Sequence, residues 1–286
     1  MTVHYVAITP ARDEEKLLPG LIRSMRAQTL APARWIVIDD GSTDRTGAIL
    51  DQAARLNPWI EPHHLSPDHP RQPGGESVIM QFLTADVWRP MDFILRLDAD
   101  LSFEPDLVEL LIAEFGRDPS LGIASPMLAE PQDGQWKDVA LRRMHTRGAA
   151  KMYSRACFEV VGNLEAGLGW DVIDGAKALR AGFATRSFGH IRCLHHRPQG
   201  SATGLLRGRY QIGRSAWYVG YSPLFLLAAA ARRAVCRPFL LGSIMMVAGY
   251  VEGFLRRRPR IDDPDLISFI RRQQMRRLLL LDSQWS

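Results

Sequence analysis

A short apolar segment that stops at two carboxylates constrains the fold of this chain more than any other feature. Residues 93–97 read Phe-Ile-Leu-Arg-Leu, and Asp98 and Asp100 follow at once. A nearly continuous apolar run of this length is typical of a strand buried on both faces of a sheet. Two hard oxygen donors at its end suit a divalent cation, Mg²⁺ or Mn²⁺, that holds a diphosphate. Equally, one of the aspartates suits the N-cap of a helix that begins near Glu104-Pro105.

Alternating strand and helix patterns place this segment in a parallel sheet. Strands are expected at residues 3–8 and 34–38, and apolar residues at helical spacing predict helices over residues 14–28 and 46–56. This β-α-β-α order predicts a parallel sheet with right-handed crossovers. Because open sheets bind ligands beyond the carboxyl ends of their strands, Asp39 and Asp40, which end the second strand, should meet the acidic pair at 98 and 100.

The remaining elements follow from the same patterns. The prolines and glycines of residues 57–75 predict a loop, which also contains three histidines. We expect helices at 76–85, 105–115, 138–160 and 176–181, and strands at 121–125 and 184–188.

Some classes of protein are excluded by motifs that the sequence lacks. It contains neither G-x-G-x-x-G nor G-x-x-x-x-G-K-[ST], which argues against a dinucleotide dehydrogenase and a P-loop NTPase. The first residues read as a strand and not as a signal peptide. Cys157, Cys193 and Cys236 lie far apart, which favours free thiols in a reducing compartment.

The last third of the chain differs from the rest in charge. From residue 205 onward it holds fourteen arginines, no lysine and five acids, a net charge of +9, whereas residues 1–204 sum to −4. Two apolar stretches, 215–231 and 238–255, are bounded by arginines. We therefore divide the chain into an α/β domain, 1–204, and a helical region, 205–286, that associates with a membrane.

Three arrangements are open for these apolar stretches. Helices in the membrane interface are favoured over a spanning hairpin and over a helical subdomain packed as in soluble proteins. The arginines flank apolar stretches instead of alternating with exposed aromatic residues, which favours the headgroups of anionic lipids as partners and not nucleic acid.

Four segments, taken together, resemble family 2 glycosyltransferases of the GT-A fold, of the bacterial exopolysaccharide or cell-envelope type. They occur in the order and at the spacings usual in that family, and they cover residues 3–190. The segments are Ile8–Glu15, Val37–Asp44, Leu97–Asp100, and Trp170-Asp171 followed by Arg180–Phe183. The resemblance implies a mostly parallel central sheet flanked by helices, and a nucleotide-sugar donor.

The resemblance also implies roles for single residues on the donor side. Thr9, Pro10 and Glu14 would line the nucleoside pocket, and Asp40 would meet the base, with Asp39 beside it. Asp98 and Asp100 match the metal-binding Asp-x-Asp of the family. Asp98 would contact the ribose or a water bound to Mn²⁺ or Mg²⁺, and Asp100 would bind that metal directly.

On the acceptor side, Asp171 fits the position of the general base. The family usually has Glu-Asp there, and this chain has Trp170-Asp171. Asp174 is the rival, because the pattern Trp-Asp-x-x-Asp offers two carboxylates, and Asp171 also suits a helix N-cap. A further metal ligand often follows the last strand of the domain, and we assign it to His196 in preference to His195.

The expected activity is therefore inverting, metal-dependent transfer of a sugar, preferably from a UDP-sugar, to a lipid-linked saccharide. It would take place at the cytoplasmic face of the bacterial inner membrane, with the protein bound peripherally. The alternatives are a soluble transferase that acts on a small acceptor, and a non-catalytic protein that binds nucleotide-sugars or membranes.

Overall fold

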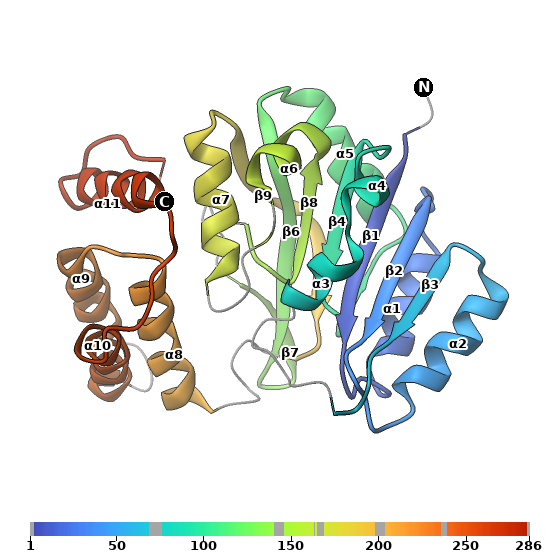
Figure 1. Ribbon diagram of the computed structural model, residues 1–286, viewed down its shortest axis with the longest axis horizontal. Coiled ribbons are helices and arrows are strands. Elements are labelled where there is room, and N and C mark those ends of the chain that lie inside the picture. Colours follow the sequence, from blue (N-terminus) through green and yellow to red (C-terminus); the bar gives the residue numbers. More distant parts are fainter. Residues whose placement is uncertain are drawn as a thin grey trace.

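A mixed, curled β-sheet forms the centre of the protein in a computed structural model (Figure 1). The structure describes residues 3–68, 76–139, 146–162, 164, 169–197, 204–235 and 239–284. The strand order is β3-β2-β1-β4-β8-β6-β9-β5, and β7 pairs with β6 outside this path. The strands are β1 (Tyr5–Ala11), β2 (Arg34–Asp39), β3 (Ile60–His64), β4 (Phe93–Leu97), β5 (Leu101–Phe103), β6 (Leu121–Gln132), β7 (Gln135–Asp138), β8 (Ala150–Ser154) and β9 (Ala184–His195).

The first half of the sheet is parallel, as the sequence predicts. β1 pairs in parallel with β2 and with β4, where Ala7 lies opposite Leu95. Along β1, Tyr5 and Ala7 enter the apolar core on one face of the sheet, and Val6 and Ile8 enter the core on the other. This alternation is the period of two that a strand imposes on its side chains. The carboxyl ends of β2 and β4 consequently open at the same edge.

Helices cover both faces of the sheet, which removes its apolar side chains from water. One core contains buried residues of α1, α2 and α5, and the other contains residues of α3, α4, α6 and α7. Their bounds are α1 (Leu18–Arg26), α2 (Thr46–Leu56), α3 (Glu76–Phe82), α4 (Ala85–Trp88), α5 (Leu107–Arg117), α6 (Arg155–Val161) and α7 (Trp170–Arg180). The α/β fold class is confirmed, although antiparallel pairings are as frequent as parallel ones.

Two predictions about local structure were wrong for identifiable reasons. The predicted loop at 57–75 contains β3, an edge strand, and its Pro62 is tolerated there because an edge strand needs only one set of ladder hydrogen bonds. The predicted helix at 138–160 contains β8 between β4 and β6. Ala, Lys and Met favour helices in isolation, but tertiary pairing overrides that preference. The strands predicted at 121–125 and 184–188 extend to Gln132 and His195.

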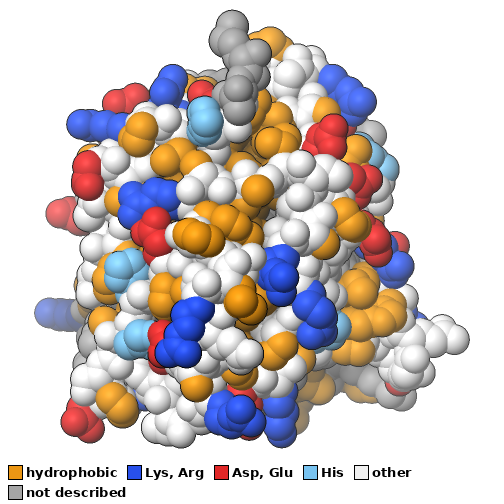
Figure 2. All heavy atoms as spheres, turned by 90° about the vertical axis from the view of Figure 1, so that its right-hand side faces the viewer, with side chains coloured by type: hydrophobic (Ala, Val, Ile, Leu, Met, Phe, Trp, Pro, Cys, Tyr) orange, Lys and Arg blue, Asp and Glu red, His pale blue; other side chains and the backbone are white. Residues whose placement is uncertain are grey.

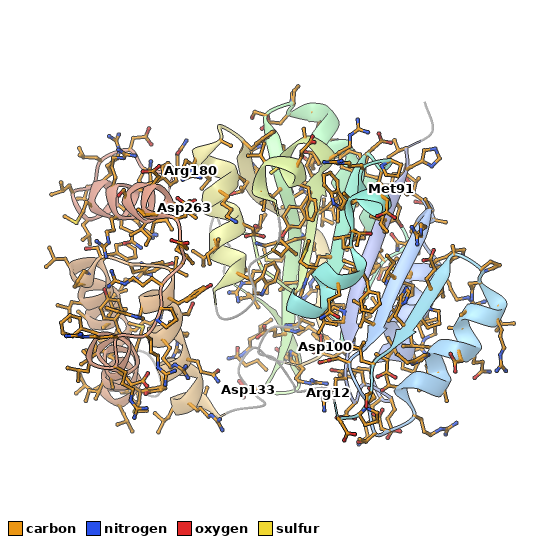
Figure 3. All side chains as sticks on the ribbon, viewed as in Figure 1. Arg12, Met91, Asp100, Asp133, Arg180 and Asp263 are labelled. Atoms are coloured by element: carbon orange, nitrogen blue, oxygen red, sulfur yellow. The ribbon has the colours of Figure 1, made fainter. Side chains whose placement is uncertain are left out.

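The C-terminal region consists of four helices beside α7 (Figure 1). Ile173 and Leu179 of α7 share an apolar core with Leu266 and Ile270 of the last helix. An ion pair reinforces this contact, with Arg180 Nη1 placed 3.0 Å from Asp263 Oδ1 (Figure 3). The helices are α8 (Leu205–Tyr218), α9 (Pro223–Arg233), α10 (Phe239–Leu255) and α11 (Pro264–Leu278).

The apolar stretch at 215–231 does not form one helix. It breaks between α8 and α9, where Gly220 adopts a left-handed φ of 82°. Of the helices that the structure describes, none combines the length and the hydrophobicity needed to cross a bilayer. The α2 and β3 side of the molecule shows acidic and basic side chains interspersed with small apolar groups (Figure 2). Most of the exposed large hydrophobic residues lie instead between Leu205 and Leu281.

Close contact between α8 and α10 generates a test of the C-terminal packing. A Cβ added at Gly249 would overlap the carbonyl oxygen of Tyr210, so Gly249→Ala forces the two helices apart. We expect it to lower the free energy of unfolding by about 1–3 kcal/mol in urea titrations. Gly208 lies on α8, and a Cβ added there would meet no atom within 4 Å, so Gly208→Ala should be neutral or stabilising. Equal effects of the two substitutions would contradict this packing.

Candidate active site

The acidic segment after β4 lies at the carboxyl edge of the parallel strands. Asp98 donates its backbone N–H to the carbonyl of Ala149 (2.8 Å), which continues the β4–β8 pairing past Leu97. Its Oδ1 lies 2.6 Å from Arg96 Nη1. Burial raises the pKa of the Asp98 carboxyl, and the positive charge of Arg96 opposes that shift. Asp100 follows at the start of β5, with only 7% of its surface exposed, at the same end of the sheet as Arg12 (Figure 3).

A histidine far along the chain completes the cluster. β5 pairs antiparallel with β9, which sets Leu101 opposite His195. His195 Nε2 lies 3.5 Å from Asp100 Oδ1, and its Nδ1 lies 3.2 Å from Glu130 Oε1. Burial alone would lower the pKa of His195, but the carboxylates of Asp100 and Glu130 raise it to about 9.

These three side chains fit a divalent cation. One ligand atom from each of Asp98, Asp100 and His195 can be chosen so that all lie within 4.8 Å of one another. Oδ1 of Asp100 is buried and accepts no hydrogen bond of good geometry, and its contact with His195 Nε2 is long, at 3.5 Å, so this oxygen can accept a further ligand. Carboxylate oxygens suit Mn²⁺ and Mg²⁺, and a carboxylate on the far nitrogen, here Glu130, orients a ligating imidazole.

The structure places the imidazole of His195, and not that of His196, beside the acidic pair. Its Nε2 lies 2.7 Å from Ser102 Oγ, and its ring packs edge-on against Trp136. Its backbone N–H donates to the carbonyl of Asp100, but its imidazole turns away from the cluster. Neighbouring residues of an extended chain point to opposite sides, so only one of the two histidines reaches the acids, and that residue is His195.

Glu14 and Arg197 border the acidic cluster. Arg197 Nη2 donates to Glu14 Oε2 (2.6 Å), and Arg197 Nε lies 3.9 Å from Asp100 Oδ2. Burial raises the pKa of the Glu14 carboxyl, and the bond from Arg197 opposes that shift. The site therefore holds a half-exposed guanidinium beside the candidate metal ligands, a group suited to phosphate oxygens. The sequence also offers Arg71 as a bidentate donor to phosphate, but this residue lies outside those that the structure describes.

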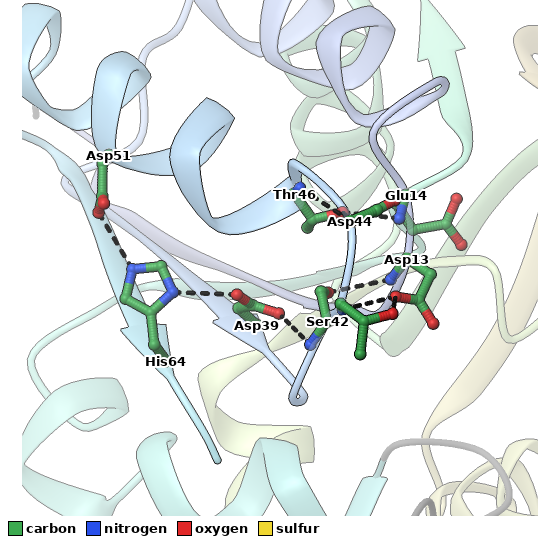
Figure 4. A network of polar contacts seen from close by, with 9 residues as sticks. Asp13, Glu14, Asp39, Ser42, Asp44, Thr46, Asp51 and His64 are labelled. Carbon is green, nitrogen blue, oxygen red and sulfur yellow. Dashed lines mark hydrogen bonds and ion pairs between the residues drawn. The ribbon is translucent and has the colours of Figure 1, made fainter. Parts of the chain in front are cut away.

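Asp39, the last residue of β2, organises the neighbouring loop (Figure 4). Asp39 Oδ1 accepts the backbone N–H of Ser42 (2.9 Å), and its Oδ2 lies 3.0 Å from Nδ1 of His64, whose Nε2 faces Asp51 at the same distance. Asp39 thus fixes the loop. Asp40 lies beside Arg12, with 3.9 Å between Asp40 Oδ2 and Arg12 Nη1.

Thr9 and Pro10 lie near the end of β1, next to this loop. The Thr9 side chain is fully buried, and its Oγ1 accepts the indole N–H of Trp35 (3.0 Å). It therefore supports the wall of the site from behind and is not open to a ligand. Pro10 is only partly buried and lies opposite Ile38 in the β1–β2 ladder.

The two carboxylates of the Trp-Asp-x-x-Asp segment have different environments. Asp171, in the first turn of α7, is partly exposed and lines a large cavity together with Glu130. Asp174 is buried, and both its oxygens accept hydrogen bonds from Lys151 Nζ at 2.8 and 2.9 Å. Burial raises the pKa of the Asp174 carboxyl, which the charge of Lys151 opposes. Asp174 is therefore a buried ion-pair partner of Lys151, whereas Asp171 is the one of the two carboxylates that lines the cavity.

Buried cations connect the base candidate to the metal cluster. Lys151 Nζ also donates to the backbone carbonyl of Asp171 (2.8 Å), which holds the start of α7 in place. Both cations also contact the ring of Trp170, with Lys151 Nζ 5.0 Å and Arg96 Cζ 4.8 Å from its centroid. No motif or periodicity in the sequence marks Lys151 or Glu130 as part of the site. Arg96 was visible as a charge inside an apolar strand.

Comparison with known proteins agrees with this geometry. Residues 6–164 match the family described as Glycosyl transferase family 2. Over 143 residues, 48% of this chain, it is 32% identical to undecaprenyl-phosphate 4-deoxy-4-formamido-L-arabinose transferase of Pectobacterium carotovorum, and it spans 41% of that relative's length.

Solved structures that share the fold include the following two. Mannosyltransferase PcManGT from Pyrobaculum calidifontis, in complex with GDP-Man and Mn²⁺, has a TM-score of 0.58 at 14% identity, with 99% of this chain and 82% of that one covered. S. aureus TarS in complex with UDP-GlcNAc has a TM-score of 0.54 at 14% identity, with 93% and 79% covered.

The two histidines provide a matched test of the cation site. His195→Asn removes a ligand and should weaken Mn²⁺ binding by at least about tenfold in calorimetric titrations without nucleotide. His196→Asn makes the same chemical change outside the cluster and should leave the affinity near that of the parent protein. The reverse order of effects would return the assignment to His196.

The buried ion pair provides a second test. Lys151→Met leaves the Asp174 carboxylate buried without its cation, and we expect a loss of about 3–5 kcal/mol in the free energy of unfolding, measured by denaturant titration. Adding Asp174→Leu should recover part of this loss, because a pair of apolar groups can replace a buried ion pair. Unchanged stability of the single variant would show that the pair is not structural.

Proposed function

The chain belongs to glycosyl transferase family 2, and on that premise we propose that it transfers a sugar from a nucleotide-sugar, preferably a UDP-sugar, to a lipid-linked saccharide. The transfer inverts the anomeric carbon and serves polysaccharide or cell-envelope synthesis. The observation that carries this proposal is the convergence of Asp98, Asp100 and His195 around the unsatisfied Oδ1 of Asp100.

On the donor side, the site has to stabilise the negative charge of the leaving group. Departure of a nucleoside diphosphate builds negative charge on phosphate oxygens. Bound Mn²⁺ or Mg²⁺ supplies Lewis-acid stabilisation of that charge, and Asp98, Asp100 and His195 are the residues that would hold it. Arg197, 3.9 Å from Asp100, adds a donor for the same oxygens.

The nucleoside would occupy the edge beyond β1 and β2. Asp40 is the residue that we assign to the base, and Pro10 and Glu14 line the pocket. Asp39, which is already bonded to Ser42 and His64, holds the loop that presents Asp40. Of these two adjacent aspartates, Asp40 would therefore bind the ligand, whereas Asp39 binds other residues of the protein.

The acceptor hydroxyl needs a base, because its pKa lies far above neutrality. Asp171 is partly exposed and lines the cavity that also reaches Glu130, whose carboxylate contacts His195. Asp171 would take the proton as the new glycosidic bond forms, on the side opposite the leaving group. Displacement in line from that side inverts the anomeric carbon.

The membrane assignment rests on the C-terminal helices. Exposed Leu240, Leu241 and Ile244 on α10 give this region an apolar surface, and its net charge of +9 suits anionic lipids. The P. carotovorum relative is by name an undecaprenyl-phosphate transferase. These features support a peripheral protein at the cytoplasmic face of the bacterial inner membrane.

The catalytic assignment generates one prediction. Asp171→Asn keeps the shape of the side chain but removes the base, so kcat should fall by about 10²–10⁴-fold. Binding of the nucleotide-sugar with Mn²⁺, read from a thermal-shift panel of UDP-, GDP- and dTDP-sugars, should stay close to that of the parent protein.

Asp262→Asn, at an exposed position, controls for the loss of one negative charge. Near-normal turnover of Asp171→Asn would remove this residue from the mechanism. Failure of every nucleotide-sugar to stabilise the parent protein with Mn²⁺ would contradict the proposed function as a whole.

A further inference from the structure

A cavity of about 860 Å³ lies between α7 and the C-terminal helices, on the side of α7 away from the sheet core (Figure 1). Asp171 and Gly175 of α7 form one wall, and side chains of α8, α9 and α11 form the others. The cavity also reaches Glu130, whose carboxylate lies 3.2 Å from His195. Any molecule seated here would therefore touch both the proposed base and the surroundings of the cation site.

The charges of the lining are strongly asymmetric. Its carboxylates are Glu130 and Asp171. Five arginines and no lysine also line it, namely Arg147, Arg209, Arg232, Arg233 and Arg277. Within the described parts of the chain, Arg209 and Arg232 have no acidic partner. Guanidinium groups bind phosphate through paired hydrogen bonds, so this excess of arginine is complementary to a phosphorylated ligand.

The rest of the lining is apolar and continues to the surface. Phe225 and Leu226 contribute to the interior, whereas Leu205, Ile212 and Leu280 lie at the opening with 65%, 41% and 94% of their surfaces exposed. Exposed leucines on α9 and α10 extend this apolar character beyond the opening. A soluble sugar phosphate would match the arginines but would leave these walls in contact with water.

We propose, on the premise of the function proposed above, that this cavity is part of the acceptor site and that it binds the phosphorylated lipid that carries the acceptor saccharide. The phosphate, or the diphosphate of a lipid-linked saccharide, lies among the arginines of α8 and α9. The hydrocarbon chain follows the apolar wall and leaves past Leu205 and Leu280 toward the membrane. The C-terminal helices thus select the acceptor, while the edge of the sheet selects the donor.

A soluble short-chain lipid phosphate tests this site directly. Farnesyl phosphate should bind the full-length protein in fluorescence titrations. Farnesol, which lacks the phosphate, and inorganic phosphate, which lacks the hydrocarbon chain, should both bind much more weakly. The double variant Arg209→Ala/Arg232→Ala should lose about tenfold in affinity for each arginine removed. Arg207→Ala/Arg272→Ala, at exposed positions outside the cavity, is the matched control and should bind like the parent protein.

The outcomes separate this inference from the proposed function. Stabilisation of the parent protein by nucleotide-sugar and Mn²⁺ reports the donor site and should persist in both double variants. If that stabilisation is present but farnesyl phosphate fails to bind, or binds equally to the cavity variant and the control, the acceptor site proposed here is wrong and the donor assignment stands. Binding of inorganic phosphate as tightly as farnesyl phosphate would also overturn it, since the apolar wall would then contribute nothing.

Discussion

The antiparallel pairing of β5 with β9 is the contact on which the candidate site depends. β5 contains only three residues, yet it anchors a strand that arrives from more than eighty residues further along the chain. This pairing brings His195 to Asp100, and it leaves a buried carboxylate oxygen facing an imidazole instead of water. Asp98 and Asp100 would repel each other at this buried edge, and the positive charges of Arg96 and His195 reduce that repulsion. A divalent cation bound by the cluster would reduce it further.

Buried positive charges hold the two halves of the site in one arrangement. Arg96 and Lys151 lie opposite each other on adjacent strands, and both contact the Trp170 ring. Arg96 binds Asp98 in the acidic cluster, and Lys151 binds the backbone of Asp171 at the start of α7. Separating a buried cation from its partners is energetically unfavourable, so Asp98 and the start of α7 both resist displacement. The tryptophan that replaces the usual acidic residue before Asp171 is thus part of the support for that residue.

The C-terminal helices add a surface of different chemistry to the α/β domain. They pack on α7 through a small apolar core of their own and leave many large hydrophobic residues exposed between arginines. Gly213 and Gly249 allow α8 and α10 to approach at backbone distance, so the bundle keeps its shape although it is small. The proposed donor site and the cavity lined by arginines and apolar residues adjoin at Glu130, which contacts His195 and lines the cavity together with Asp171.

The sequence by itself determined the features that depend on local patterns. The β4 strand and the α2 helix were predicted with their bounds, because periodicity and turn residues act over a few positions, and the acidic residues were correctly placed at strand ends. Tertiary structure decided which member of each candidate pair contacts which partner. His195 and not His196 joins the acids, and Asp174 and not Asp171 pairs with Lys151. It also made a strand of residues 150–154, whose composition favours a helix. The physical reason is common to all three: strand pairing and burial fix where a side chain points, and both are set by residues distant in the chain.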